Sequence, residues 1–201
     1  MGRVLLNGRP DFGGRSLARL MAFVDGGYLR KNFESKCNST SLNLEVLKNQ
    51  FVSNFNANCQ GKYDGDLLRV YYYDAAVKPS NKRYKEQENY FSKIRAINGF
   101  DVRLGRLVHS GNQGTGQLRQ KGVDVRLAVD MISKAYQNHY DFAILLAGDN
   151  DFLDVVEEVK DTGKRVYGMY FRDHISKQLQ DSFDARIEID NFVNNLKLEE
   201  N

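Results

Sequence analysis

Aspartates follow several of the most apolar segments of the chain, at places where carboxylates can hold metal ions. Asp25, Asp74 and Asp149 each end a predicted strand, and Asp151 follows two residues later. The carboxyl ends of parallel strands meet at one edge of a sheet, and α/β proteins bind ligands at that edge. Asp25 and Asp149 also lie beside glycines, which let backbone segments approach closely. We therefore expect these carboxylates to face a common crevice.

Each of these aspartates, taken alone, has a commoner explanation. An aspartate after a strand is usually a turn former or the N-cap of the next helix. Asp149 or Asn150 could cap the helix that is predicted to follow them. The metal hypothesis therefore depends on several carboxylates meeting, together with one further residue.

Asp124 is that further residue, because it lies on the apolar side of a helix predicted over residues 123–138. At about 100° per residue it falls in the middle of the apolar arc, where an unpaired carboxylate is costly. Its position in the first turn would let it point along the edge of the sheet instead. A salt bridge with Lys121 or Arg126 is the alternative. Asp130, by contrast, falls on the polar arc and is predicted to be solvated.

Crowded carboxylates favour a particular kind of metal. They repel one another, and the pKa of each rises unless cations neutralise them. Oxygen ligands without histidine or cysteine select Mg²⁺ or Mn²⁺. Such ions activate water and stabilise the charge that develops on a phosphodiester during hydrolysis. The ligand types therefore indicate phosphodiester chemistry.

Other chemistries are excluded by residue spacing. His109, His139 and His174 have no second metal ligand three or four residues away, which argues against zinc hydrolases. Cys37 and Cys59 form no CxxC motif and no disulfide framework. An aspartyl-nucleophile phosphatase needs a second aspartate two residues after the first, and the chain has glycine there. A Toprim-type site needs a glutamate after an early strand, where the chain has an aspartate instead.

Alternating strands and helices must position these residues. Predicted strands cover residues 21–25, 66–74, 101–109, 142–146, 165–171 and 186–189. Predicted helices begin at about residue 28 and cover 44–55, 79–99, 123–138, 150–162 and 174–183, with a Gly/Gln-rich loop over 110–122. The run at 143–146 is apolar on both faces, as a central parallel strand requires. The pattern predicts a three-layer α/β/α fold with a central, mostly parallel, Rossmann-like sheet.

The length of 201 residues fits one domain. We expect a flexible Gly/Arg-rich leader over residues 1–20 and a single domain over 21–201; whether the natural start is Met1 or Met21 stays open. No apolar run approaches the roughly 20 residues that cross a bilayer, and the first residues lack the apolar core of a signal peptide. We therefore expect a cytoplasmic protein without a membrane partner.

Three motifs, in order, resemble the NYN branch of the PIN-like nucleases, the family that includes LabA-type proteins. They are Phe23-Val24-Asp25-Gly26-Gly27, Lys121-Gly122-Val123-Asp124-Val125-Arg126-Leu127-Ala128-Val129-Asp130 and Leu146-Ala147-Gly148-Asp149-Asn150-Asp151-Phe152. The resemblance covers about residues 21–171, and the second and third motifs are specific together. It implies a PIN-like fold and a metal-dependent endoribonuclease.

The resemblance also implies the site residues. Asp25, Asp124, Asp149 and Asp151 would be both the catalytic set and the ligands of Mg²⁺ or Mn²⁺. The family's first motif often reads Asp-Gly-x-Asn, and Tyr28 stands here in place of the asparagine. A catalytically weak or inactive PIN-like module that binds RNA or a protein partner is the alternative function.

Basic residues predict where single-stranded RNA would be held. The net charge is only +3, so the distribution is more informative than the total. One basic stretch, residues 78–85, lies between tyrosines. A second runs from Arg106 to Arg119 and Lys121, and it is favoured because it leads into Asp124. With Tyr28, these three residues are the predicted substrate-binding set; a second copy of the chain or a protein partner stays open.

Overall fold

The computed structural model describes residues 15–109 and 118–198, and it describes side chains in that part of the chain outside residues 106–121. The central feature is a seven-stranded sheet with the order β4-β3-β2-β1-β5-β6-β7. Every neighbouring pair is parallel except β3 and β4, which are antiparallel. The strands are β1 (Ser16–Asp25), β2 (Tyr63–Ala76), β3 (Phe100–His109), β4 (Leu118–Lys121), β5 (Phe142–Leu146), β6 (Arg165–Tyr170) and β7 (Ala185–Glu188).

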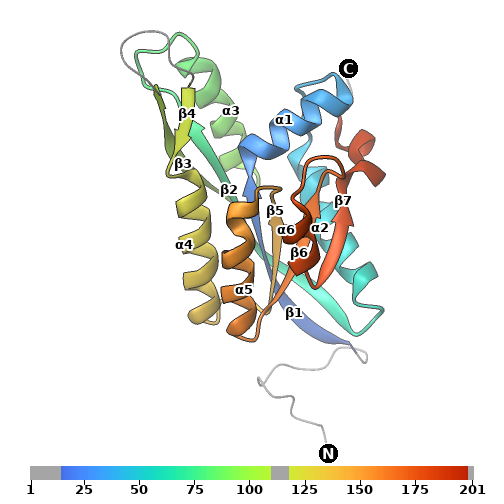
Figure 1. The fold of residues 1–201 in the computed structure, drawn as a ribbon. Coiled ribbons are helices and arrows are strands. Elements are labelled where there is room, and N and C mark those ends of the chain that lie inside the picture. Colours follow the sequence, from blue (N-terminus) through green and yellow to red (C-terminus); the bar gives the residue numbers. More distant parts are fainter. Residues whose placement is uncertain (1–14, 110–117, 199–201) are drawn as a thin grey trace, which may run out of the picture.

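Helices cover both faces of this sheet (Figure 1). One face carries α1 (Gly26–Cys37), α2 (Leu44–Asn58), α3 (Tyr84–Ala96) and the short helices η2 (Ile189–Asn191) and η3 (Val193–Leu196). The other face carries α4 (Val123–Tyr136), η1 (Asn150–Phe152), α5 (Leu153–Asp161) and α6 (Lys177–Ser182). The predicted three-layer α/β/α class is therefore confirmed.

The central strand β1 distributes its side chains between the two layers. Ala22 and Val24 are fully buried on the α1 side, whereas Phe23 is fully buried on the α4 side. This alternation follows from the two-residue repeat of a strand. From β1 the chain builds outward to β2 and β3, and later returns to the other side of β1 as β5. The order of strands thus reverses between β1 and β5, and such a switch point is where open α/β sheets bind ligands.

Three of the predicted elements differ most from the structure. The helix predicted over 79–99 spans only Tyr84–Ala96. The first strand begins at Ser16 instead of Met21, because Ala18 and Leu20 are buried in the core and continue the strand backward. Residues 16–20 therefore do not belong to a leader, and residues 1–14 lie outside the described part. The segment predicted as a loop over 110–122 contains β4, which pairs with β3 through its backbone and needs no apolar repeat to do so.

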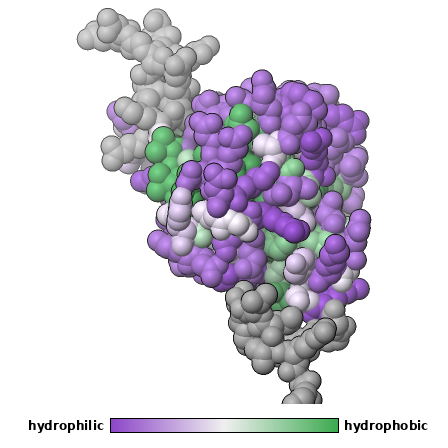
Figure 2. All heavy atoms as spheres, turned by 60° about the horizontal axis from the view of Figure 1, so that its bottom comes forward, coloured by the Kyte–Doolittle hydropathy of each residue, from purple (hydrophilic) through white to green (hydrophobic). Residues whose placement is uncertain are grey.

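The surface at the end of the sheet where β1 begins is mainly polar (Figure 2). Figure 2 views the molecule from the end where β1 begins, and hydrophilic residues predominate there with smaller apolar areas between them. In the part of the chain that the structure describes, no helix has the length and apolar character that crossing a membrane requires.

An ion pair fastens β1 to β5 at the end opposite the switch point. The Arg19 side chain donates hydrogen bonds of 2.6 and 3.1 Å to the two carboxylate oxygens of Asp141, and its backbone N–H donates a third of 2.9 Å. Burial alone would raise the pKa of Asp141, but the hydrogen bonds and the charge of Arg19 outweigh burial and lower it. The ionised form of Asp141 is therefore favoured in the folded protein.

We expect Asp141→Asn to lower the free energy of unfolding by about 1–3 kcal/mol at pH 7, because one partner of a charge-assisted pair is removed. A lowered pKa contributes stability above the unfolded-state value of about 4 and loses it as the pH falls further. The deficit should therefore shrink below about pH 4. Urea unfolding at several pH values measures it, and a deficit that stays constant down to pH 3 would contradict the assignment.

Candidate functional site

Asp25 lies at the carboxyl end of β1, at the switch point. It is the N-cap of α1, where its Oδ1 accepts a hydrogen bond of 3.0 Å from the backbone N–H of Tyr28. In the sheet register Asp25 is beside Tyr73 of β2, and the preceding Val24 is beside Leu146 of β5. The side chain is half-buried. A carboxylate offers about four acceptor positions, so one capping bond leaves Asp25 able to bind a cation.

Asp149 and Asp151 follow β5 on the other side of the switch point. Asp149 is the N-cap of η1, and its Oδ1 accepts a hydrogen bond of 3.1 Å from the backbone N–H of Asp151. The prediction that Asp149 could be a helix cap is therefore confirmed. Both side chains are exposed, so the remaining oxygens face solvent.

Asp124 lies in the first turn of α4 and is exposed. The buried residues of this helix form a single line that passes beside it: Val123, Leu127, Met131 and Ala135. The prediction that Asp124 lies in the middle of the core-facing arc was therefore wrong, because that arc is centred on the line through Val123 and Leu127 and Asp124 is exposed. Among the described side chains it makes no ion pair, and Arg126 instead donates a 2.7 Å hydrogen bond to the carbonyl oxygen of Leu104.

Two of these carboxylates, Asp25 and Asp124, have raised pKa values. Burial, followed by the charges of Asp124 and Asp74, raises the pKa of Asp25 to about 6 although its capping bonds oppose the rise. Burial, followed by the charges of Asp149 and Asp151, raises the pKa of Asp124. The charges on either side of Asp124 therefore repel it: that of Asp25 at the end of β1, and those of Asp149 and Asp151 after β5.

The donors suit a hard divalent cation in kind, because they are all carboxylates. In the described part of the chain, however, no three acidic, histidine or cysteine side chains are gathered closely enough to hold a metal as they stand. Asp124 lies within electrostatic reach of Asp25 and also of Asp149 and Asp151, and the described residues assemble no closed ligand cage. Three of the four are exposed and can turn without unpacking the core.

Asp74, the remaining strand-end aspartate, is occupied by a partner of its own. Its side chain is only 1% exposed and forms a two-pronged pair with Arg30 of α1, with hydrogen bonds of 2.8 and 3.0 Å. The backbone N–H of Ala75 donates a further bond of 2.7 Å. Burial nevertheless raises the pKa of Asp74. This residue anchors α1 beside the carboxylate edge instead of facing it as an open ligand.

Tyr28 fills the switch point between β1 and β5. Its hydroxyl oxygen accepts a 3.0 Å hydrogen bond from the backbone N–H of Phe171, just after β6. Its ring lies so close to Gly148 that an added Cβ there would come within 2.4 Å of a ring carbon. Burial raises the pKa of the Tyr28 hydroxyl. Tyr28 therefore links the ends of three strands, a contact that its sequence context alone did not reveal.

A second polar cluster fixes α4 against the sheet. Asp130 accepts a hydrogen bond of 2.8 Å from the Tyr73 hydroxyl and one of 3.1 Å from Lys134, and Arg103 lies 3.7 Å away. The prediction that Asp130 is solvated was wrong. The tyrosines in the sequence of β2 could have indicated this contact, because a buried tyrosine hydroxyl needs a hydrogen-bond partner. The cluster positions the helix that carries Asp124.

Three of the four predicted RNA-binding residues lie on the edge strand β4 and its neighbour β3. Arg106 of β3 pairs in register with Lys121 of β4, and Arg119 pairs with Val108. The backbone of β4 then leads through Gly122 directly into α4. The side chains of Arg106, Arg119 and Lys121 lie outside the described residues, so their substrate-binding role stays a prediction.

Comparisons with known proteins agree with this arrangement. A family model described as the NYN domain matches residues 19–190. A solved structure of a protein of unknown function from Vibrio parahaemolyticus RIMD 2210633 resembles the chain with a TM-score of 0.60 and 19% identity. That likeness covers 90% of this chain and 98% of the other, and at this identity it shows the fold alone. Comparison with curated proteins gives no match.

Asp25→Asn tests the electrostatic strain at the edge, because asparagine keeps the cap and removes the charge. A raised folded-state pKa contributes stability below the unfolded value near 4 and loses it as the pH rises through about 6. In metal-free protein we expect the variant to be more stable than the wild type by about 1–3 kcal/mol above pH 6, with no advantage near pH 4. Denaturant unfolding measures this, and a pH-independent difference would contradict it.

Proposed function

The chain belongs to the NYN domain family of the PIN-like nuclease superfamily, and on that premise we propose that it is a metal-dependent endoribonuclease that cuts single-stranded RNA. The observation that carries the proposal is the mutual repulsion of aspartates from separate elements at the switch point of the sheet. Among the side chains that the structure describes, none forms an ion pair with Asp25, Asp124, Asp149 or Asp151, and carboxylates in such surroundings favour a cation from solution.

Asp25, Asp124, Asp149 and Asp151 would hold Mg²⁺ or Mn²⁺ through carboxylate oxygens. The bound ion would activate water and offset the negative charge on the phosphodiester. Asp25 and Asp149 are the fixed members of the set, because a backbone N–H at the start of the following helix binds one oxygen of each. The exposed Asp124 and Asp151 are free to turn toward the ion from the solvent side.

The edge is held in place by residues that need not touch RNA. Asp130 and its partners on the sheet fix the helix that carries Asp124. Tyr28 fixes the ends of β1, β5 and β6 relative to one another. We propose that Tyr28 supports the substrate site in this way, in the place where related sequences often have an asparagine.

Arg106, Arg119 and Lys121 would bind RNA phosphates on the approach to Asp124. Lysine and arginine bind phosphates independently of base sequence, which fits a nuclease for unpaired strands. The in-register pairing of Arg106 with Lys121 supports a shared basic surface at this sheet edge. A cytoplasmic location and membership of the LabA-type branch belong to the same proposal.

A non-catalytic module that binds RNA or a protein is the second candidate. The observation in its favour is that Asp25 and Asp149 each serve as a helix cap. The described carboxylates also do not form a closed metal cage. This candidate predicts RNA binding without cleavage at any metal concentration.

Cleavage of labelled single-stranded RNA tests the proposal. We expect Mn²⁺ or Mg²⁺ to support cutting and a chelator to abolish it. Asp124→Asn and Asp149→Asn should each lower the rate by at least about 100-fold, because each removes a charged metal ligand. Asp161→Asn is the matched control, since Asp161 is exposed at the far end of α5. If both site variants cut RNA at the wild-type rate, Asp124 and Asp149 are not ligands of a catalytic metal.

Salt dependence tests the basic surface separately. Each phosphate contact to a single strand contributes about −0.7 to the slope of log affinity against log salt. We expect the Arg119→Ala/Lys121→Ala double variant to bind RNA more weakly and to flatten the slope by about 1.4. Filter binding at several salt concentrations measures this. If the slope matches that of the wild type, these residues do not contact phosphates.

A further inference from the structure

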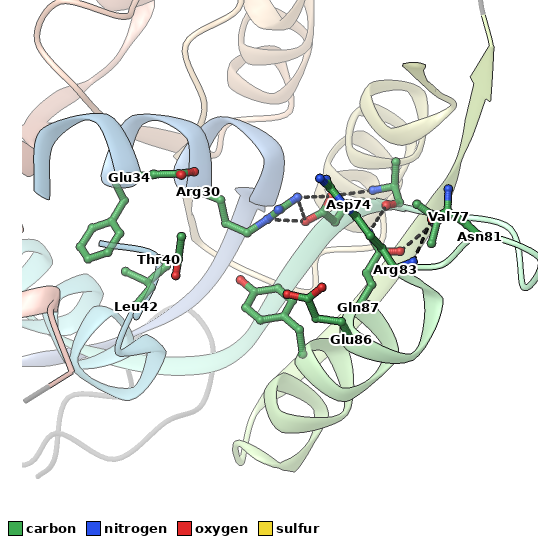
Figure 3. A pocket seen from close by; sticks show the side chains of 13 residues that line it. Arg30, Glu34, Thr40, Leu42, Asp74, Val77, Asn81, Arg83, Glu86 and Gln87 are labelled. Carbon is green, nitrogen blue, oxygen red and sulfur yellow. Dashed lines mark hydrogen bonds and ion pairs between the residues drawn. The ribbon is translucent and has the colours of Figure 1, made fainter. Parts of the chain in front are cut away.

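A cavity of about 840 Å³ opens between α1 and α3, beside the carboxyl end of β2 (Figure 3). Its volume falls within the roughly 300–1,000 Å³ that small-molecule sites occupy. Asp74 and Arg30 line it. Asp74 also acts electrostatically on Asp25, and Tyr73 is beside Asp25 in the sheet. The cavity is therefore one strand away from the proposed cutting site.

The inner wall of the cavity is fixed before any ligand arrives. The pair between Arg30 and the buried Asp74 joins α1 to the end of β2. On the opposite side, the Gln87 side chain accepts a hydrogen bond of 2.7 Å from the Val77 N–H and donates one of 3.0 Å to the Ala75 carbonyl. These bonds fasten α3 to the same strand end. Because these residues are already held in place, they lose little conformational entropy when a ligand binds.

Arg30 presents a planar donor surface to this cavity. Its Nε and one terminal nitrogen bind Asp74, and among the described residues its other terminal nitrogen has no hydrogen-bond acceptor. The guanidinium lies 5.7 Å from the centre of the Tyr90 ring, and the Tyr90 hydroxyl is 3.0 Å from that of Tyr72. Guanidinium planes and tyrosine rings are surfaces on which nucleobases stack.

The rim adds a positive charge at the mouth. Asn81 and Arg83 line the cavity, and both belong to the basic stretch 78–85. Arg83 is exposed and, within the described residues, makes no ion pair. Glu34 and Glu86 lie on the rim as well and restrict where an anion can sit. A fitting ligand is therefore planar and hydrogen-bonding at one end and anionic at the other.

We propose that this cavity binds one nucleotide of the RNA strand, next to the nucleotide that is cut, with the base against Arg30 and the phosphate near Arg83. The inference deepens the proposed function, because it gives the ribonuclease a specific place for a neighbouring residue of its substrate. It also gives a role to the basic stretch 78–85, which the carboxylate site does not use.

Binding of single nucleotides to the full-length, metal-free protein tests this proposal. Adenosine and uridine monophosphates and inorganic phosphate are titrated separately by NMR at low salt. We expect Arg83→Glu to weaken nucleotide binding about fivefold to tenfold, since it replaces attraction by repulsion at the rim. Glu86→Gln should strengthen binding. Lys93→Glu is the matched control, because Lys93 is an exposed cation in the last turn of the same helix.

Arg30→Lys tests the base contact. Lysine keeps a positive charge beside Asp74 but lacks the guanidinium plane. We expect nucleotide binding to weaken at least threefold, with inorganic phosphate unaffected and a thermal scan showing that the variant folds. If this variant does not fold, Arg83→Glu, Glu86→Gln and the control Lys93→Glu still test nucleotide binding in the cavity.

The outcomes separate this inference from the proposed function. RNA cleavage at the normal rate, together with equal nucleotide affinities in the wild type, Arg83→Glu and Lys93→Glu, would contradict nucleotide binding in the cavity. It would leave the proposed ribonuclease activity intact. If Arg83→Glu weakens nucleotide binding but the protein never cuts RNA, the nucleotide site in the cavity is supported and the proposed cleavage activity is contradicted. No nucleotide binding by the wild type at millimolar concentration would overturn the cavity directly.

Discussion

Negative charges held together at the centre of the sheet's carboxyl edge are the constraint on which the rest of the structure depends. Asp25 is half-buried there, and burial, followed by the charges of Asp124 and Asp74, raises its pKa to about 6. Such a group opposes folding when it is ionised. The surrounding structure compensates with anchors at a distance from it: Arg30 against Asp74, Asp130 against Tyr73 and Lys134, and Arg19 against Asp141. Each anchor joins a helix or strand to the sheet, so the edge is held by its surroundings.

The layers of the fold were predictable because they follow from periodicity. The apolar run of β5 and the alternation of strands with helices predict a covered, mostly parallel sheet, which the structure has. The beginning of β1 and the strand β4 were not predictable in the same way. Residues 16–20 mix charged and apolar side chains, and β4 is short and on the edge, where backbone hydrogen bonds decide.

The candidate site was predictable in part, for a similar reason. Position at strand ends indicated Asp25, Asp149 and Asp151 as candidates, and a helical wheel added Asp124. The same context indicated that Asp149 could be a cap, which it is. Partners distant in sequence were not visible. Asp130 looked solvated because a helical wheel shows only its own helix, whereas the Tyr73 hydroxyl that it binds comes from a strand 57 residues earlier. The fit of Tyr28 against Gly148 likewise depends on the first turn of α1 and the loop after β5, which meet only after folding.

Because β1 begins at Ser16, the residues before Met21 are needed to complete the central strand. Synthesis from the internal methionine at position 21 would omit the first half of the strand, including the buried Ala18 and Leu20. It would also omit Arg19, leaving Asp141 half-buried without its cation, and would expose the pairing edges of β2 from Tyr63 to Leu67. A polypeptide beginning there would lack part of the central strand around which both layers assemble. Residues 16–20 are therefore an integral part of the folded domain.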